Sequence, residues 1–273
     1  MQPFKPVEEL TFTDDFMFCT VLEEHKDICK EIIELLLNIQ VQDIEYSNKQ
    51  QAFKTRYETK GIRLDVYVKD SNRIIDLEMQ TTIPPALEKR VRYYQSVMDI
   101  SELEQGKGYD EVKDSYIIFL CLKDPFKEKY SRYTVKQTFE ENNSIYYNDG
   151  RHVVFFNASA YESAKTEKIK SFLEYLATKK SKDELTNKID NIVSTTKVNE
   201  EFGRSYMIAN MRDIMMKKQA FNEGLQQGSH ETKIETARKL LLKNVDIAII
   251  SDCTGLSLET IEDLAKKINP KEN

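Results

Sequence analysis

The chain of 273 residues carries 40 Lys and Arg against 46 Asp and Glu, a formal net charge of −6. This acidic balance excludes a protein that coats nucleic acid through a generally basic surface, although it allows a local basic patch. Hydrophobic residues make up 40% of the chain, enough to bury a sizeable core, so disorder of the whole chain is also excluded. No window approaches the roughly 20 apolar residues of a membrane span, and the first residues lack the apolar segment of a signal peptide. We therefore expect a cytoplasmic protein without membrane contact.

The first 62 residues predict two helices and a short strand. Thr13-Asp14-Asp15 is typical of a helix N-terminus, where acidic side chains favour the positive end of the helix dipole. Apolar residues then recur at helical spacing up to Leu37, with a predicted break at His25-Lys26-Asp27. A short strand over 41–46 and a polar loop ending at Gly61 are expected to follow.

Two segments with a period of two come next. Residues 63–69 and 75–80 alternate between apolar and polar side chains, and the turn-forming residues 70–72 separate them. This pattern predicts a β-hairpin with one apolar face and one face lined by carboxylates, including Asp65 and Glu78.

The register of this hairpin decides whether the two carboxylates meet. Cross-strand partners share a face, so Asp65 faces Glu78 only if each pair of position numbers has an odd sum. A three-residue loop would pair Lys69 with Arg73 and place Asp65 opposite Leu77. We therefore predict a loop of two or four residues, or a bulge that shifts the register.

The remaining residues predict one more helix, three strands and a helical tail. The helix starts at Pro84-Pro85 and ends near Glu104, and from Ser163 onward the chain shows helical patterns only. The strands are expected over 115–122, 133–139 and 152–157. This order predicts an α/β domain over 1–160 and a helical C-terminal extension over 161–273.

The end of the tail resembles a helix-turn-helix unit. Two apolar runs, 245–251 and 258–267, are joined by a turn that contains Gly255. The second run also carries three acidic residues, which suit the major groove of DNA poorly, so a packing or oligomer contact is favoured.

The hairpin carboxylates define a candidate metal site. Carboxylates on neighbouring strands can hold a hard cation such as Mg²⁺ or Mn²⁺, and the backbone carbonyl of Met79 is a candidate third ligand beside Asp65 and Glu78. A metal there would polarise a phosphoryl oxygen and activate a water for phosphodiester hydrolysis. The alternative is an ordinary solvated polar face of a hairpin, which periodicity alone favours.

Several motifs resemble a known nuclease family. The segments GIRLDVYV at 61–68 and DLEMQ at 76–80 resemble the core of the PD-(D/E)XK nuclease superfamily, and more narrowly the Rpn family of recombination-promoting nucleases and related transposases. Three further segments match that family in the same order: TDDFMF at 13–18, KRVRYYQ at 89–95 and YNDG at 147–150. Ordered motifs are more specific than a single one, and they favour the metal site over the solvated face. The resemblance implies a restriction-endonuclease-like core with a mixed sheet flanked by helices.

The resemblance also implies an activity and roles for residues. It implies a bacterial-type, metal-dependent DNA endonuclease that promotes recombination, with Asp65 and Glu78 as metal ligands and Gln80 at the place of the superfamily's catalytic lysine. Leu64 replaces the motif's proline, a minor change. Gln80 is the larger departure, because a neutral amide can position a water but supplies no positive charge. We expect greater reliance on the metal.

Other residues are candidates for supporting roles. Asp14 and Asp15 are candidates for an additional acid at the metal, although a capping role explains at least one of them equally well. Lys89, Arg90 and Arg92 are candidates for contact with DNA phosphate. Residues 54–92 hold nine Lys and Arg against six Asp and Glu, a local charge of +3.

Two other functions stay open at this point. The first is a catalytically weak or inactive nuclease fold that binds DNA as an accessory protein, an interpretation that Gln80 favours. The second is a regulatory protein whose helical tail is the working part. The oligomeric state is open as well, and a homodimer would place two sites on opposite DNA strands.

Overall fold

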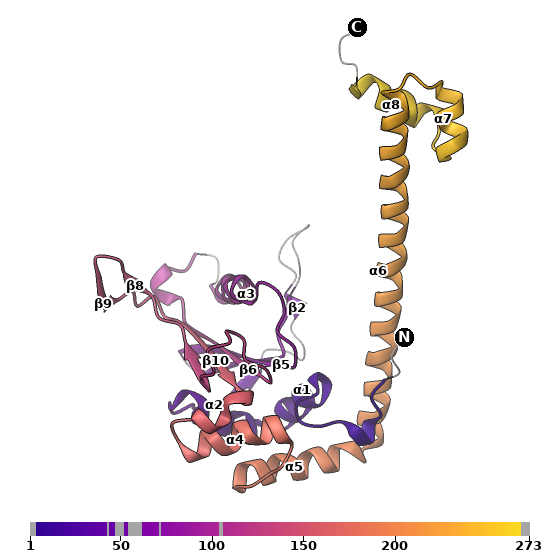
Figure 1. Ribbon diagram of the computed structural model, residues 1–273. Helices are drawn as coiled ribbons and strands as arrows, with labels where there is room; N and C mark the ends of the chain where they lie inside the picture. The colour runs from indigo at the N-terminus through magenta and orange to yellow at the C-terminus, as the bar shows by residue number, and fades with distance from the viewer. Residues whose placement is uncertain are drawn as a thin grey trace. The chain divides into compact units, whose positions relative to one another are not determined.

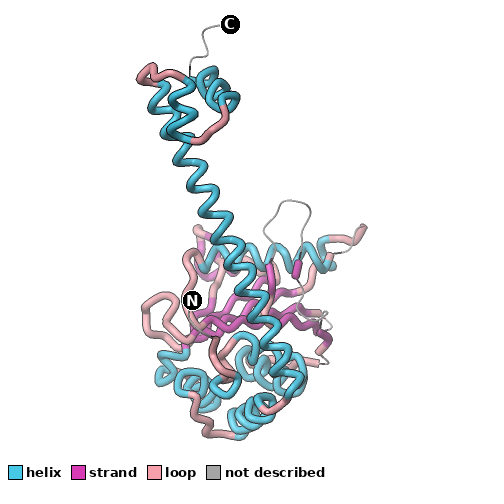
Figure 2. Tube along the Cα trace, turned by 90° about the vertical axis from the view of Figure 1, so that its right-hand side faces the viewer, coloured by secondary structure: helices cyan, strands magenta, loops and turns pink. Residues whose placement is uncertain are grey.

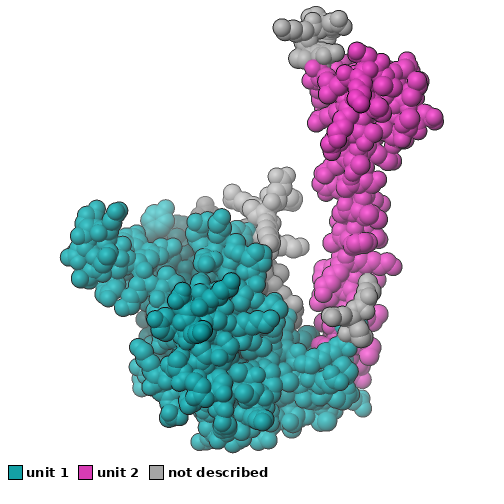
Figure 3. Space-filling view, viewed as in Figure 1, with its two compact units in different colours: residues 1–203 teal, residues 204–273 magenta. Residues whose placement is uncertain are grey.

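The computed structural model describes residues 4–42, 44–46, 52–53, 62–70, 72–103 and 106–268. It divides the chain into two compact units, residues 1–203 and 204–273, which Figure 3 shows in different colours. The polar loop predicted up to Gly61 lies for the most part outside the described residues, as does the helix end predicted at Glu104.

Unit 1 is built on a six-stranded mixed sheet with the strand order β1-β4-β5-β6-β10-β7. Its strands are β1 (Glu45–Tyr46), β4 (Val66–Asp70), β5 (Arg73–Gln80), β6 (Asp114–Cys121), β7 (Arg132–Thr134) and β10 (Arg151–Asn157). The three central strands β5, β6 and β10 run parallel, and the outer strands pair antiparallel to their neighbours. The mixed α/β architecture predicted from the sequence is confirmed.

Two small sheets of two strands each complete the described β-structure. They pair β2 (Ala52–Phe53) with β3 (Ile62–Arg63), and β8 (Thr138–Phe139) with β9 (Asn142–Tyr146). The single strand predicted over 133–139 is therefore divided between β7 and β8. Strand β9 has no counterpart among the predicted strands, because its residues are all exposed and show no alternation of buried and exposed positions.

Helices cover both faces of the sheet. Figures 1 and 2 show α3 on one face and helices α1, α2 and α4 on the other. The helical segments of unit 1 are η1 (Val7–Glu9), α1 (Asp15–Glu24), α2 (Lys26–Leu37), α3 (Leu87–Glu102), η2 (Tyr109–Glu111), η3 (Ala158–Ser163), α4 (Glu167–Thr178) and α5 (Glu184–Lys197). The predicted break between the first two helices falls at His25. Helix α3 begins at Leu87 and not at Pro84-Pro85 as predicted, because the N-cap residue Ala86 has a φ of 56°, which is not helical.

The sequence predicts the residues of α4 and α5 as part of the C-terminal extension. In the structure they belong to unit 1, because α4 packs against α2, and α5 packs against α1, α2 and α4. The structural boundary therefore lies at residue 203, inside helix α6 (Glu200–Leu241), and not at 160.

Unit 2 holds the predicted helix-turn-helix segment. Helices α7 (Ile247–Thr254) and α8 (Leu258–Ile268) pack with the end of α6 around five buried side chains: Ala237, Ile250, Leu256, Ile261 and Leu264. The turn begins at Gly255, whose φ of 67° is a left-handed conformation that costs glycine little. No helix among the described residues is long and apolar enough to cross a membrane.

The hairpin of β4 and β5 has the register that the metal hypothesis requires. Asp70 pairs with Arg73, so two residues join the strands, and Val66 pairs with Leu77. Each pair has an odd sum, as predicted. The second face is not solvated, however, because α3 covers it and leaves Asp76 and Glu78 fully buried. The alternative of a solvated polar face is therefore wrong.

The burial of β5 leads to a prediction about the stability of the fold. Leu77 is 0% exposed, whereas Ile100 on α3 is 67% exposed. Leu77→Ala should lower the free energy of unfolding by about 2–5 kcal/mol through lost burial and a residual cavity, as urea denaturation would measure. Ile100→Ala is the matched control and should change it by less than about 0.5 kcal/mol. Equal effects of the two substitutions would contradict the assigned strand faces.

Candidate metal centre

Two hydrogen bonds join Asp65 to the Glu78–Met79 segment of β5. The backbone N–H of Asp65 donates to Oε1 of Glu78 over 3.1 Å, and the N–H of Met79 donates to Oδ2 of Asp65 over 3.0 Å. Asp65 directly precedes β4 and lies at the position that continues the register opposite Glu78. The backbone itself therefore fixes the two carboxylates side by side.

The two candidates for an additional acid have different surroundings. The carboxylate of Asp14 accepts hydrogen bonds from Lys5 (2.5 Å) and from the backbone N–H and hydroxyl of Thr11, and it makes no capping bond to α1. Burial raises the pKa of Asp14, but these hydrogen bonds outweigh it and hold that pKa below its usual value. Asp15 is exposed and lies near Asp65. Of the two candidates, only Asp15 therefore lies beside Asp65 in a group of potential metal ligands within the described part of the chain.

One group of donor atoms among the described residues has the spacing of a metal site. A ligand atom from each of Asp15, Cys19 and Asp65 lies within 4.8 Å of the other two. Carboxylate oxygens are the ligands that Mg²⁺ and Mn²⁺ take, and two carboxylates this close repel each other unless a cation offsets their charge. The oxygen donors therefore fit a divalent cation, while the buried Cys19 thiol contributes a softer neighbour.

Glu78 lies outside that group of three and is held differently. Its side chain is 0% exposed, and Oε2 accepts a hydrogen bond of 3.0 Å from the guanidinium of Arg90. Burial and then the Asp65 charge raise the pKa of Glu78 to about 8, while Arg90 opposes the shift. A metal cation near Asp65 and Glu78 would favour the charged forms of both carboxylates, as Arg90 does for Glu78.

Arg90 is the contact that the sequence analysis did not anticipate. Besides Glu78, its guanidinium donates to the side-chain oxygen of Gln80 over 3.3 Å and to the hydroxyl of Tyr94 over 2.8 Å. Lys89 and Arg92, the other two predicted phosphate contacts, are exposed on α3. The structure therefore groups Arg90 with the carboxylates and leaves its two neighbours on the surface.

Gln80 completes this network. Its side chain is 8% exposed, and its amide nitrogen donates to the backbone carbonyl of Met79 over 3.1 Å and to Oε2 of Glu78 over 3.4 Å. The carbonyl proposed as a metal ligand thus lies within reach of the Gln80 amide. The Gln80 amide therefore contacts both the Met79 carbonyl and the Glu78 carboxylate, which are two of the candidate metal ligands.

Asp76 is a second buried carboxyl beside the site. It is 0% exposed, and neither of its carboxyl oxygens has a hydrogen-bond partner among the described residues. Burial, and after it the Glu78 and Asp65 carboxylates, raise the pKa of Asp76 well above its usual value. Asp76 thus adds to a concentration of acidic groups at this end of β5.

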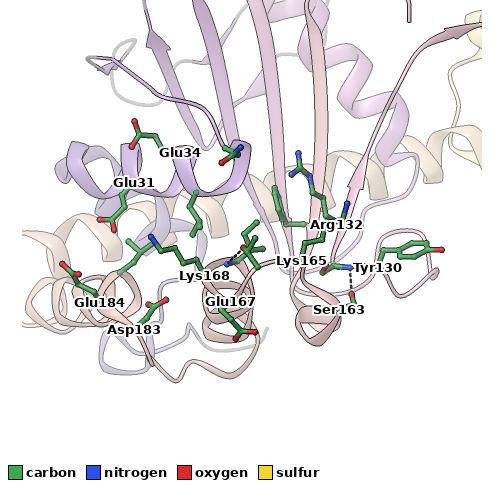
Figure 4. Close-up of a pocket in the computed structure, with 17 residues that line it drawn as sticks. Glu31, Glu34, Tyr130, Arg132, Ser163, Lys165, Glu167, Lys168, Asp183 and Glu184 are labelled. Carbon is green, nitrogen blue, oxygen red and sulfur yellow. Dashed lines mark hydrogen bonds between the residues drawn. The ribbon is translucent and has the colours of Figure 1, made fainter. Parts of the chain in front are cut away.

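A separate cavity of about 900 Å³ lies elsewhere in unit 1. Figure 4 shows side chains of both signs around it, among them Glu31, Glu34, Arg132 and Lys168. It is lined by parts of α2, α4 and the start of α5, and none of Asp15, Asp65 or Glu78 lines it. The acidic cluster and the cavity are therefore distinct features.

A family model identifies the family of the protein. The model for the PD-(D/E)XK nuclease family transposase matches residues 12–231, which include α1, the hairpin, α3 and the rest of the sheet. Because the match spans most of the chain, the protein belongs to the PD-(D/E)XK nuclease family of transposases. Comparison with curated proteins and with solved structures gave no significant match.

The Arg90–Glu78 pair makes a prediction about stability. Removing one partner of a buried pair leaves the other charge uncompensated. Because Arg90 is 31% exposed, Arg90→Gln should lower the free energy of unfolding by about 1–3 kcal/mol, less than for a fully buried pair. Adding Glu78→Gln should recover about 1 kcal/mol of that loss in a double-mutant cycle measured in urea with EDTA at a pH above the Glu78 pKa of about 8, where this carboxylate is charged.

The control for this cycle is Arg92→Gln on the same helix. Its side chain is exposed, so the substitution should change the free energy of unfolding by less than about 0.5 kcal/mol. Strictly additive effects of Arg90→Gln and Glu78→Gln would contradict the pairing.

Proposed function

We propose that this protein is a divalent-metal-dependent endonuclease that hydrolyses phosphodiester bonds of DNA, with Mg²⁺ or Mn²⁺ as its cofactor. The observation that carries the proposal is the pair of backbone hydrogen bonds that holds Asp65 beside Glu78, one from Asp65 to Glu78 and one from Met79 to Asp65, with ligand atoms of Asp15 and Asp65 within 4.8 Å of each other. Family membership supports nuclease chemistry at these motif positions.

The proposed roles follow from the surroundings of each side chain. Asp65, Glu78 and the Met79 carbonyl would hold the metal, with Asp15 as the additional acid. A bound metal would supply Lewis acidity toward a phosphoryl oxygen and make its water a better nucleophile. Gln80 would orient the attacking water by hydrogen bonding alone, because a neutral amide acts neither as an acid nor as a base.

The exposed residues of α3 suit an approach by DNA. Lys89 and Arg92 are exposed on the helix that carries Arg90. Their exposure supports the proposed role of both side chains as contacts to DNA phosphates. We extend the proposal to a role in recombination or the movement of mobile elements, in the cytoplasm. A homodimer would allow both strands to be cut.

The first prediction concerns cleavage itself. Wild-type protein should convert supercoiled plasmid to nicked or linear DNA with Mg²⁺ or Mn²⁺, and not with EDTA. Asp65→Asn keeps the side-chain shape but weakens metal binding, so the cleavage rate should fall by about 10³-fold, equivalent to about 4 kcal/mol of transition-state stabilisation. Agarose-gel time courses would measure both rates, and an Asp65→Asn rate equal to wild type would refute the proposed centre.

The second prediction uses two neighbouring acids as a matched pair. Asp15→Asn should weaken Mn²⁺ binding in calorimetric titration and slow cleavage by about 10-fold or more, because one ligand loses its charge. Asp14→Asn should leave both nearly unchanged and lower the free energy of unfolding by about 1 kcal/mol, because only the bonds to Lys5 and Thr11 weaken. The reverse result would assign the additional acid to Asp14.

One observation favours a second function. Gln80 replaces the superfamily's lysine, and a site without that charge could bind DNA and metal without turnover. In that case wild-type protein would retard DNA on a gel yet leave plasmid intact with either metal. The plasmid assay therefore separates a nuclease from a binding accessory.

A further inference from the structure

Position 80 carries a neutral amide, yet a positive charge lies next to it. The guanidinium of Arg90 donates to Oε2 of Glu78 over 3.0 Å and to the side-chain oxygen of Gln80 over 3.3 Å. Both accepting side chains belong to β5, whereas Arg90 belongs to α3. The cation therefore reaches the site from the helix that covers the sheet.

Several contacts hold the guanidinium in this place. Its Nε donates to the hydroxyl of Tyr94, one helical turn further along α3, and its carbon lies 4.8 Å from the centre of the Tyr94 ring. Tyr94 is itself buried in the core between α3 and the sheet. A fork of donors with three separate acceptors leaves the guanidinium little freedom, and such fixed charges act on a reaction without reorganisation.

The same side chain is open on one side. Arg90 is 31% exposed while Glu78 is 0% exposed, so part of the guanidinium faces solvent beside the buried carboxylate. An anionic group that approaches the acidic cluster would meet this cation there. Lys89 and Arg92 are exposed along their helix and have no described contact with the carboxylates.

We propose that Arg90 supplies from α3 the positive charge that a lysine at position 80 would supply, acting as a positioning residue for Glu78 and Gln80 and as an electrostatic partner for the phosphate under attack. This inference rests on the proposed nuclease function. Arginine stays protonated, so Arg90 takes no proton from water. Its contribution is to orient Gln80, to balance the charge of Glu78 and to offset the negative charge that develops on the phosphate.

This role differs from that of an ordinary phosphate contact. A surface cation such as Arg92 acts mainly on affinity, with a strong dependence on salt concentration. A fixed charge beside the reacting phosphate acts mainly on the rate of the bound complex. Substitution of Arg90 should therefore lower mainly kcat, whereas substitution of Arg92 should raise mainly KM.

The experiment measures cleavage of a fluorescent duplex with Mg²⁺, together with DNA affinity in EDTA. Arg90→Gln should lower kcat by about 10²-fold and change KM and metal-free affinity by less than about 3-fold. Arg92→Gln should instead raise KM and weaken affinity, with kcat within about 3-fold of wild type. Urea denaturation of the metal-free proteins would show that each variant is folded.

Gln80→Lys in the Arg90→Gln background is the decisive variant. It returns a cation to the site from β5, so kcat should rise by at least about 10-fold over Arg90→Gln alone. If Arg90→Gln fails to fold, Arg90→Lys replaces it: it keeps the charge and should retain kcat within about 10-fold of wild type.

Three results would overturn the inference. The first is a wild-type kcat for Arg90→Gln, and the second is a folded double variant with no recovery. The third is a loss in Arg90→Lys as large as that of Asp65→Asn. Inactivity of the wild type at the level of Asp65→Asn would overturn the proposed function as well, so the two failures are distinguishable.

Discussion

The structure of the site depends on one constraint, the placing of a carboxylate inside the protein. Glu78 is fully buried beneath α3, where an isolated charge would be costly. Three donors contact it: the N–H of Asp65 at Oε1, and the guanidinium of Arg90 and the amide of Gln80 at Oε2. These contacts link β4, β5 and α3 at a single point.

The carboxylates of Asp65, Asp76 and Glu78 repel one another, and this repulsion favours a cationic ligand. Besides burial, the charges of Glu78 and Asp65 raise the pKa of Asp76, and the charge of Asp65 raises the pKa of Glu78, while the Arg90 guanidinium opposes both shifts. A divalent cation would relieve this repulsion, as metal binding and deprotonation are coupled. The arrangement is thus more easily explained by metal binding than by stability of the fold, since buried ion pairs are weak evidence for stability.

Much of the fold and part of the site could be predicted from the sequence. The alternation around Asp65 and Glu78 identified both strands. The parity argument allowed a loop of two or four residues or a bulge, and the pairing of Asp70 with Arg73 leaves a loop of two. The burial of Glu78 could not be predicted, because alternation shows that a face is polar but not that α3 lies over it. The same limit hid the inward direction of Arg90, although its spacing of four residues from Tyr94 places both on one helix face. The assignment of α4 and α5 to the core likewise depends on long-range packing that local patterns do not contain.

The central claim is that Asp15, Asp65 and Glu78 form a metal centre. Crystals soaked in Mn²⁺ and measured at the manganese absorption edge test it most directly, because anomalous scattering locates the ion without reference to activity. The account predicts one strong peak in contact with the carboxylates of Asp65 and Asp15 and adjacent to Glu78. No peak there, or a peak only in the cavity near Glu31 and Glu34, would contradict it.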